Sequence, residues 1–261
     1  KTKLDLEDEI DPENRIFLCT KNSVHVLAMR QFYQQAFELQ QKKEFEQALH
    51  ICNIVRDTKY QLEQKRVDSI HLDYAFQLFA KGEFEQAMIH FKESNDDPRI
   101  VLGLFPDLLP STSKSYKQMA PFSLEEKAKV DKMLKNVEQR NNALTALIQY
   151  LTPKRVPVTE EISKTDLQIA EAVDTALLKA LLYSNDECVT SFLQNPNRCI
   201  IADSERVLHQ HNKFAELVQF YKSKGLHDRA LTLLKQLGNA DKNKDSGIEY
   251  TDLVGVRPTI K

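Results

Sequence analysis

A thirteen-residue pattern occurs twice in the chain and constrains the fold more than any other feature. Residues 36–48 read AFELQQKKEFEQA and residues 75–87 read AFQLFAKGEFEQA, so nine of the thirteen positions are identical at an offset of 39. A weaker third copy at 221–231 aligns Gly225 with Gly82 and Ala230 with Ala87. Repeats of this length indicate supersecondary units that stack because none can bury its apolar face alone.

Each copy predicts a helical hairpin, in which a Lys-Lys-Glu or Lys-Gly-Glu turn joins an apolar helix to a second helix beginning Phe-Glu-Gln-Ala. The small Ala48 and Ala87 would lie where the two helices approach closely. We expect the core around them to contain Phe45, Phe84, Leu39 and Leu78. The fold class predicted is therefore all-α, a right-handed α-solenoid of stacked helical hairpins.

The N-terminal part differs from this pattern. Two β-prone runs, 15–20 and 24–29, flank the turn tripeptide Lys21-Asn-Ser and predict a β-hairpin. An isolated hairpin is marginally stable in water, so we expect its remaining strands to lie upstream of residue 1. The absence of an initiator Met agrees with an expectation that this chain is a piece of a longer protein.

Helix caps and prolines predict how the chain is divided. Ser123-Leu-Glu-Glu126 is a capping box that starts a helix, and Thr165-Asp-Leu-Gln168 is expected to cap another. The stretch between these helices contains Pro153 and Pro157 and has no apolar periodicity. The segments expected are the end of an upstream β domain at 1–30, α-solenoid at 31–110, a loop at 111–122, α-solenoid at 123–151, a mobile linker at 152–165, α-solenoid at 166–238 and a polar tail at 239–261.

Charge and cysteine usage exclude several classes of function. Asp and Glu number 38 against 36 Lys and Arg, for a net charge of −2, so the basic footprint typical of nucleic-acid-binding proteins is missing. Only six glycines occur, which argues against a phosphate-cradling loop. The four cysteines form no CxxC pair, which is typical of a reduced chain, and no apolar run approaches the ~18 residues that span a bilayer.

Two groups of residues resemble metal sites only superficially. Asp241, Asn243 and Asp245 match a calcium loop, but Ser246 replaces the turn glycine and Asp252 replaces the bidentate glutamate. The spacing of the other group fits no common zinc pattern, so core thiols and surface imidazoles are the better interpretation; its members are Cys188, Cys199, His209 and His211. We therefore expect no metal and no cofactor.

The charged residues also lack a catalytic arrangement. The carboxylate pairs Glu125/Glu126 and Glu160/Glu161 are explained by helix capping and solvation. A lysine row is interpreted as a solvated helix face, with a docking patch for an acidic partner as the alternative; it consists of Lys127, Lys129, Lys132 and Lys135. Because no nucleophile, phosphate-binding or metalloprotease motif occurs, we predict no catalytic or cofactor-binding residues and no enzymatic activity.

Three segments together resemble one family. They are the paired EFEQA hairpins, Gly103-Leu-Phe-Pro-Asp-Leu-Leu-Pro110, and the block from Ala202-Asp-Ser-Glu-Arg-Val-Leu-His to Leu231. The resemblance covers most of 15–238 and is to the vacuolar sorting tethers, which have an N-terminal citron-homology β-propeller and a clathrin-heavy-chain-like helical solenoid. It implies that residues 15–29 are the last strands of the propeller. The family's C-terminal zinc-binding cysteine pairs match no residue here.

The resemblance also implies a function. Such a chain would be an arm segment in a HOPS-type complex that tethers late endosomes, autophagosomes and lysosomes or vacuoles before fusion. Its implied partners are the other HOPS core subunits, a Rab GTPase bound mainly through the propeller, and SNAREs reached through the complex. The implied location is cytoplasmic and peripheral on late endosome and lysosome membranes, with no nucleic acid bound.

Two alternatives remain at this point. The resemblance extends to a sister subunit of the CORVET complex, which would place the chain on early endosomes. A peptide-binding helical-repeat adaptor is also conceivable, although tetratricopeptide repeats have a period of 34 and a clamp of lysines and asparagines for a carboxylate.

Overall fold

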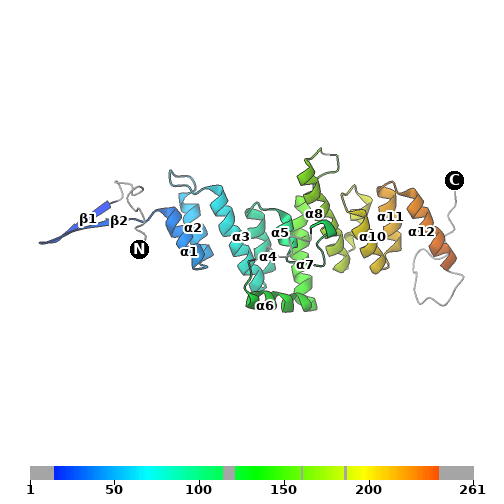
Figure 1. The fold of residues 1–261 in the computed structure, drawn as a ribbon, viewed down its shortest axis with the longest axis horizontal. Coiled ribbons are helices and arrows are strands. Elements are labelled where there is room, and N and C mark those ends of the chain that lie inside the picture. Colours follow the sequence, from blue (N-terminus) through cyan, green and yellow to red (C-terminus); the bar gives the residue numbers. More distant parts are fainter. Residues whose placement is uncertain (1–14, 114–120, 160, 185–186, 241–261) are drawn as a thin grey trace. The chain divides into compact units, whose positions relative to one another are not determined.

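The computed structural model describes residues 15–113, 121–159, 161–184 and 187–240. They divide into two compact units, with residues up to 77 and 90–95 in unit 1 and residues 78–89 and 96 onward in unit 2. The all-α fold class with a short β-hairpin is confirmed (Figure 1). The strands are β1 (Arg15–Cys19) and β2 (Val24–Ala28). The helices are α1 (Phe32–Gln41), α2 (Phe45–Val55), α3 (Gln64–Lys81), α4 (Phe84–Glu93), α5 (Pro98–Leu102), α6 (Leu124–Lys135), α7 (Val137–Leu151), the 3-10 helix η3 (Thr152–Lys154), α8 (Lys164–Tyr183), α9 (Cys188–Gln194), α10 (Ile201–Gln210), α11 (Phe214–Ser223) and α12 (His227–Ala240).

Four hairpin turns share one backbone geometry, which explains the sequence repeat. The residue after each first helix has a positive φ: 61° at Lys43, 88° at Gly82, 54° at Asn212 and 69° at Gly225. The following N–H then donates to the carbonyl five residues back, as Glu44 does to Leu39 and Glu83 does to Leu78. This is a Schellman C-cap, which satisfies helix-end carbonyls and turns the chain sharply.

The residue that completes each of these turns also begins the next helix. The carbonyls of Glu44 and Glu83 accept from the backbone N–H groups of Ala48 and Ala87 at 3.1 and 2.9 Å. One residue therefore ends one helix and starts another, so the two helices must leave the turn close together. In these two turns the position three residues into the second helix holds an alanine, and Ala48 and Ala87 are both fully buried.

The predicted packing of the hairpins is confirmed in most positions. Phe45 in unit 1 and Phe84 and Leu78 in unit 2 are buried beside their alanines. Leu39 is only half-buried, because it packs against the core of unit 1 on one side and lines an open pocket on the other. The core of unit 1 consists of Ala36, Phe45, Ala48, Leu49, Cys52, Val55, Leu62 and Ile70.

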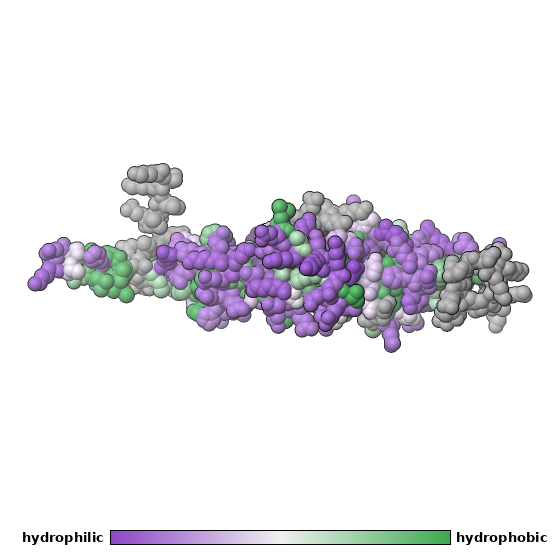
Figure 2. All heavy atoms as spheres, turned by 90° about the horizontal axis from the view of Figure 1, so that it is seen from below, coloured by the Kyte–Doolittle hydropathy of each residue, from purple (hydrophilic) through white to green (hydrophobic). Residues whose placement is uncertain are grey.

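Strands β1 and β2 form an antiparallel pair in which Arg15 is opposite Ala28 and Cys19 is opposite Val24. Its apolar side chains remain exposed, from 50% at Leu18 to 64% at Ile16. Figure 2 shows them as a group of apolar residues on this two-stranded element.

Helix α8 is the centre of unit 2. All of residues 172–182 are buried, whereas a helix at a protein surface buries one stripe only. Helices α5, α7, α9 and α10 and the short η3 all contact α8. Two charged residues, Asp174 and Lys179, lie within this buried run.

The sequence predicted two helix starts, at Ser123 and at Thr165. The capping box at Ser123 is confirmed, since Ser123 Oγ accepts from the N–H of Glu126 and the Glu126 carboxylate accepts from the N–H of Ser123. The cap expected at Thr165 is wrong: α8 begins at Lys164, and Ser163 Oγ accepts from the N–H of Asp166. Ser163 provides the same hydroxyl and has Asp166 in the favoured first-turn position, so the helix starts two residues earlier.

The expected linker at 152–165 contains more structure than its composition predicts. Residues 152–154 continue α7 as η3, and α8 takes the last two residues of the range. Whether the remaining residues are mobile stays a prediction, although those at 155–158 make the contacts described below.

Candidate functional site

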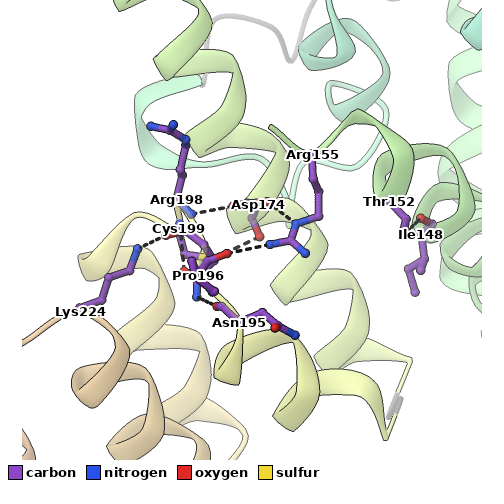
Figure 3. A network of polar contacts seen from close by, with 10 residues as sticks. Ile148, Thr152, Arg155, Asp174, Asn195, Pro196, Arg198, Cys199 and Lys224 are labelled. Carbon is purple, nitrogen blue, oxygen red and sulfur yellow. Dashed lines mark hydrogen bonds and ion pairs between the residues drawn. The ribbon is translucent and has the colours of Figure 1, made fainter. Parts of the chain in front are cut away.

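The most heavily connected polar group in the described residues surrounds Asp174, in the middle of α8. Its carboxylate is almost fully buried and accepts two hydrogen bonds, from Arg155 Nε at 2.8 Å and from the backbone N–H of Arg198 at 2.6 Å (Figure 3). A buried carboxylate is tolerated only when it is paired and hydrogen-bonded in this way. We call this group the Asp174 junction: Arg155, Asp174, Thr175, Asn197, Arg198, Cys199 and Lys224.

The two arginines tie separate segments together. Arg155 Nη2 also donates to the carbonyl of Pro196, and its guanidinium lies 4.6 Å from the ring centre of Phe192. Arg198 Nη2 donates in the opposite direction, to the carbonyls of Pro157 and Val158 at 3.0 and 3.1 Å. We call residues 155–158, which follow η3, the strap. An arginine of the strap donates hydrogen bonds to the α9–α10 connection, and an arginine of that connection donates to the strap. The two segments are therefore held to each other and to α8.

Helix α11 joins the same junction through Lys224, whose Nζ donates to the carbonyl of Asn197 at 2.6 Å. Burial lowers the pKa of Lys224, while Cys199 and Asp174 oppose that shift. Cys199 Sγ lies 3.3 Å from the carbonyl of Asp174, and burial together with this carboxylate raises the pKa of the thiol. The neutral thiol is therefore a small packing group and not a nucleophile.

A second polar group lies further along α8 and holds residues 109–111. Asp203 of α10 accepts from the N–H and hydroxyl of Ser111 at 2.9 and 3.0 Å and from Arg206 at 2.6 Å. Lys179 Nζ lies 3.5 Å from the carbonyl of Leu109. Burial lowers the pKa of Lys179, with Asp203 opposing. Burial alone would raise the pKa of Asp203, but Ser111 and the two cations hold it below its usual value.

Both groups act on the protein itself. Their hydrogen bonds run between α8 and the segments packed around it, so the carboxylates and cations serve as internal ties. The Ser111 hydroxyl donates to the Asp203 carboxylate as one of these ties, and the Cys199 thiol has a raised pKa.

A small pocket in unit 2 is the other candidate. Its volume is about 210 Å³, and it lies between the segment 105–108, α6 and α7. Phe105, Leu108 and Leu144 supply apolar surface, and Arg140 and Asp107 form an ion pair of 3.4 Å at the edge. The segment that carried the family resemblance thus forms one wall, but two acids and two bases line the pocket and give it no preference for a charged ligand.

The structure does not bring the suspected zinc ligands together. Cys188 is exposed and Cys199 is buried, His209 contacts the ring of Phe214, and His211 contacts the ring of Tyr183. Within the described ranges, no group of three or more His, Cys, Asp or Glu side chains could hold a metal ion.

The remaining candidates are charged residues at a helix start or on exposed surface. Glu126 completes the capping box, and Lys127, Lys129, Lys132 and Lys135 are exposed on α6. Glu161 is exposed, while Glu160 and the calcium-like run from Asp241 to Asp252 lie outside the described residues.

Sequence reasoning missed Asp174, Lys179 and Asp203. A usable signal was present, because Asp174 and Lys179 interrupt the run AVDTALLKALL, in which every neighbouring position is apolar or small. A charge on all-round apolar surface must be paired internally, so such a residue predicts a buried ion pair.

Comparison with known proteins adds the family context. Residues 173–255 match the family model of Vacuolar sorting protein 39 domain 1. The chain is 30% identical over 266 residues to the Vam6/Vps39-like protein of Homo sapiens, which covers 93% of this chain and 29% of that protein. It is also 30% identical to the Vacuolar protein sorting-associated protein 39 homolog of Drosophila melanogaster, over 94% of this chain and 27% of that protein.

A related but distinct group also matches. The Transforming growth factor-beta receptor-associated protein 1 homolog of Danio rerio is 28% identical, over 88% of this chain and 26% of that protein. The chain therefore spans less than a third of the length of these relatives. No solved structure matches it significantly. The resemblance predicted from the sequence is confirmed, and the junction helix α8 lies mostly within the matched domain.

Proposed function

We propose that this segment of a vacuolar sorting protein 39-type chain is a non-catalytic arm of a HOPS-type tethering subunit, which acts in the fusion of late endosomes and autophagosomes with lysosomes or vacuoles. Its similarity to Vps39-type proteins along 93% of its length is the observation that carries the proposal. The structure supports a mechanical role, because its buried charges tie helices together.

The arm would join a Rab-facing propeller to the core of the complex. Strands β1 and β2 would be the last part of that propeller, and their exposed Ile16, Phe17 and Val26 would be covered by neighbouring strands. The other HOPS subunits would be direct partners, whereas SNAREs would be reached through the complex. Among the helices of the described ranges, none is long and apolar enough to cross a membrane. We propose peripheral association with late endosomes and lysosomes.

The four Schellman turns explain how such an arm could hold a fixed distance. Each turn has a hydrogen-bonded C-cap and buries a small residue or a leucine three residues into the next helix, so none of these four hairpins depends on a flexible loop. Where the connections between helices are longer, the Asp174 junction would fix the distance instead. It holds residues 155–158 and the α9–α10 connection against α8.

Affinity purification of the full-length parent protein from cells tests the assignment. Recovery of the HOPS core subunits is expected. Recovery of the early-endosomal CORVET subunits without them would move the chain to the group of the TGF-β receptor-associated proteins, and recovery of neither set would refute the tethering role. A peptide-adaptor role would require binding of C-terminal peptides by the isolated chain, and the mixed charges of the 105–108 pocket do not favour a carboxylate.

A further inference from the structure

Two histidines from different helices of unit 1 face each other directly. His71 lies in α3 and His90 lies in α4, and their Nδ1 atoms are 2.9 Å apart. Both side chains are half-buried. The ring of Tyr74 lies 4.6 Å from that of His90, so the pair is covered on this side by an aromatic ring.

The ring geometry identifies the contact as a hydrogen bond. The ring centroids are 5.1 Å apart, close to the greatest separation possible when the two Nδ1 atoms are 2.9 Å apart. The two nitrogens therefore point at each other nearly in line. In a pair that chelates a metal, both lone pairs would instead converge on a third point beside the rings. One neutral imidazole must donate its Nδ1–H, and the other must accept.

The charges around the pair are modest and come from three helices. Asp68 on α3 and Glu93 on α4 are close enough to favour a protonated ring, as is Glu46 on α2 for His90, while Arg56, the residue after α2, opposes protonation of His71. Glu46 already accepts a hydrogen bond from the hydroxyl of Tyr74 at 2.7 Å. None of these carboxylates makes a hydrogen bond to either imidazole in the structure.

From this geometry we infer that His71 and His90 form a pH-sensitive latch that holds the last turn of α4 against α3 near neutral pH and releases it on acidification. The latch needs one donor and one acceptor between the rings. When both imidazoles are protonated, both Nδ1 atoms carry hydrogens, so the hydrogen bond is lost and two positive charges meet.

The direction of the effect follows from linkage. Burial lowers the pKa of both histidines, and for His90 the neighbouring His71 lowers it further. The unfolded chain therefore binds more protons than the folded chain below the ordinary histidine value of about 6.5. The latch contributes its full stability above that pH and loses it as the pH falls through the lower folded values.

Imidazole titration of the full 261-residue chain by NMR tests this inference without any mutation. We expect His71 and His90 to titrate in two coupled steps below about pH 6.5. Each pKa unit by which folding lowers a histidine changes the ratio of folded to unfolded protein about tenfold at low pH. Independent titration of both rings near the ordinary value would overturn the latch. This result would leave the tethering assignment untouched, since that assignment rests on partner recovery.

A variant set measures the release itself by amide hydrogen exchange in residues 90–95. In the wild type, protection corrected for intrinsic exchange should fall at least tenfold between pH 7.5 and 5.5. His90→Asn keeps a hydrogen-bonding group that cannot be protonated, so its protection should change much less. His50→Gln, an exposed histidine of α2, is the matched control and should behave as the wild type. An equal fall in His90→Asn and wild type would contradict the inference.

Discussion

The backbone N–H of Glu44 donates to the carbonyl of Leu39 at 2.9 Å, across a lysine, Lys43, whose φ is 61°. The equivalent turns at Gly82 and Gly225 use glycine, and the turn at Asn212 uses asparagine, the residues that tolerate this conformation. The turn at Lys43 makes the same hydrogen bonds as the other three turns, but its left-handed residue is a lysine, whose backbone is strained in this conformation.

Lys43→Gly should stabilise unit 1. Relief of left-handed strain is worth about 1–2 kcal/mol, and the added freedom of glycine in the unfolded chain costs about 0.4–1 kcal/mol. The net gain should be about 0.5–1 kcal/mol in chemical denaturation. Gly225→Ala is the reverse change at a site where a Cβ meets no atom within 4 Å, so it should destabilise by a similar amount. A loss of stability in Lys43→Gly, or a gain in Gly225→Ala, would contradict the turn assignment.

The sequence predicted the hairpins whose turns contain glycine or are followed by the EFEQA motif. The turn at Asn212 has the same hydrogen bonds but reads His-Asn-Lys-Phe-Ala, so neither feature was available to recognise it. The start of α8 was misplaced because Ser163 and Thr165 are both suitable caps, and only the structure shows which hydroxyl accepts. Buried Asp174 could not be paired from sequence, because Arg155 and Arg198 lie in segments without periodicity.

Asp174→Ala should be strongly destabilising. Arg155 and the N–H of Arg198 would lose their acceptor inside the protein, and breaking a buried pair typically costs about 3–5 kcal/mol. The matched control is Glu38→Ala, since Arg30 and Glu38 form an exposed pair at 2.6 Å that should be worth about 1 kcal/mol or less. Equal effects of the two variants on the denaturation midpoint would refute the role of the Asp174 junction.

The second buried group should respond asymmetrically. Asp203→Ala removes the acceptor of Ser111 and Arg206 and takes from Lys179 the stronger of its two acidic neighbours, so a loss of about 3 kcal/mol or more is expected. Lys179→Met replaces the buried lysine by an apolar side chain of similar shape, so the buried charge is removed. Asp203 still accepts hydrogen bonds from its other donors, Ser111 and Arg206. Its unfolding free energy should stay within about 1 kcal/mol of the wild type. A larger loss in Lys179→Met than in Asp203→Ala would show that the lysine is the essential member.

Thiol reactivity should separate the described cysteines into two pairs. Cys19 and Cys188 are exposed, whereas Cys52 and Cys199 are buried with raised thiol pKa values. A thiol reagent at pH 8 should label the first two quickly and the other two only after denaturant is added. Fast labelling of Cys199 in the native chain would mean that the Asp174 junction opens readily.

In the proposed arm, the hairpins transmit position and do not bind the Rab themselves. Ala87→Arg in the full-length subunit should disrupt a fully buried hairpin position, whereas Ala128→Arg on an exposed face of α6 is the matched control. The most direct measurement is reconstituted fusion of late-endosomal or vacuolar membranes, with Rab binding scored on the same preparations. Loss of fusion in Ala87→Arg with Rab binding retained, and normal fusion in Ala128→Arg, is the predicted result. Normal fusion in a verified Ala87→Arg protein, or loss of Rab binding along with fusion, would contradict the claim.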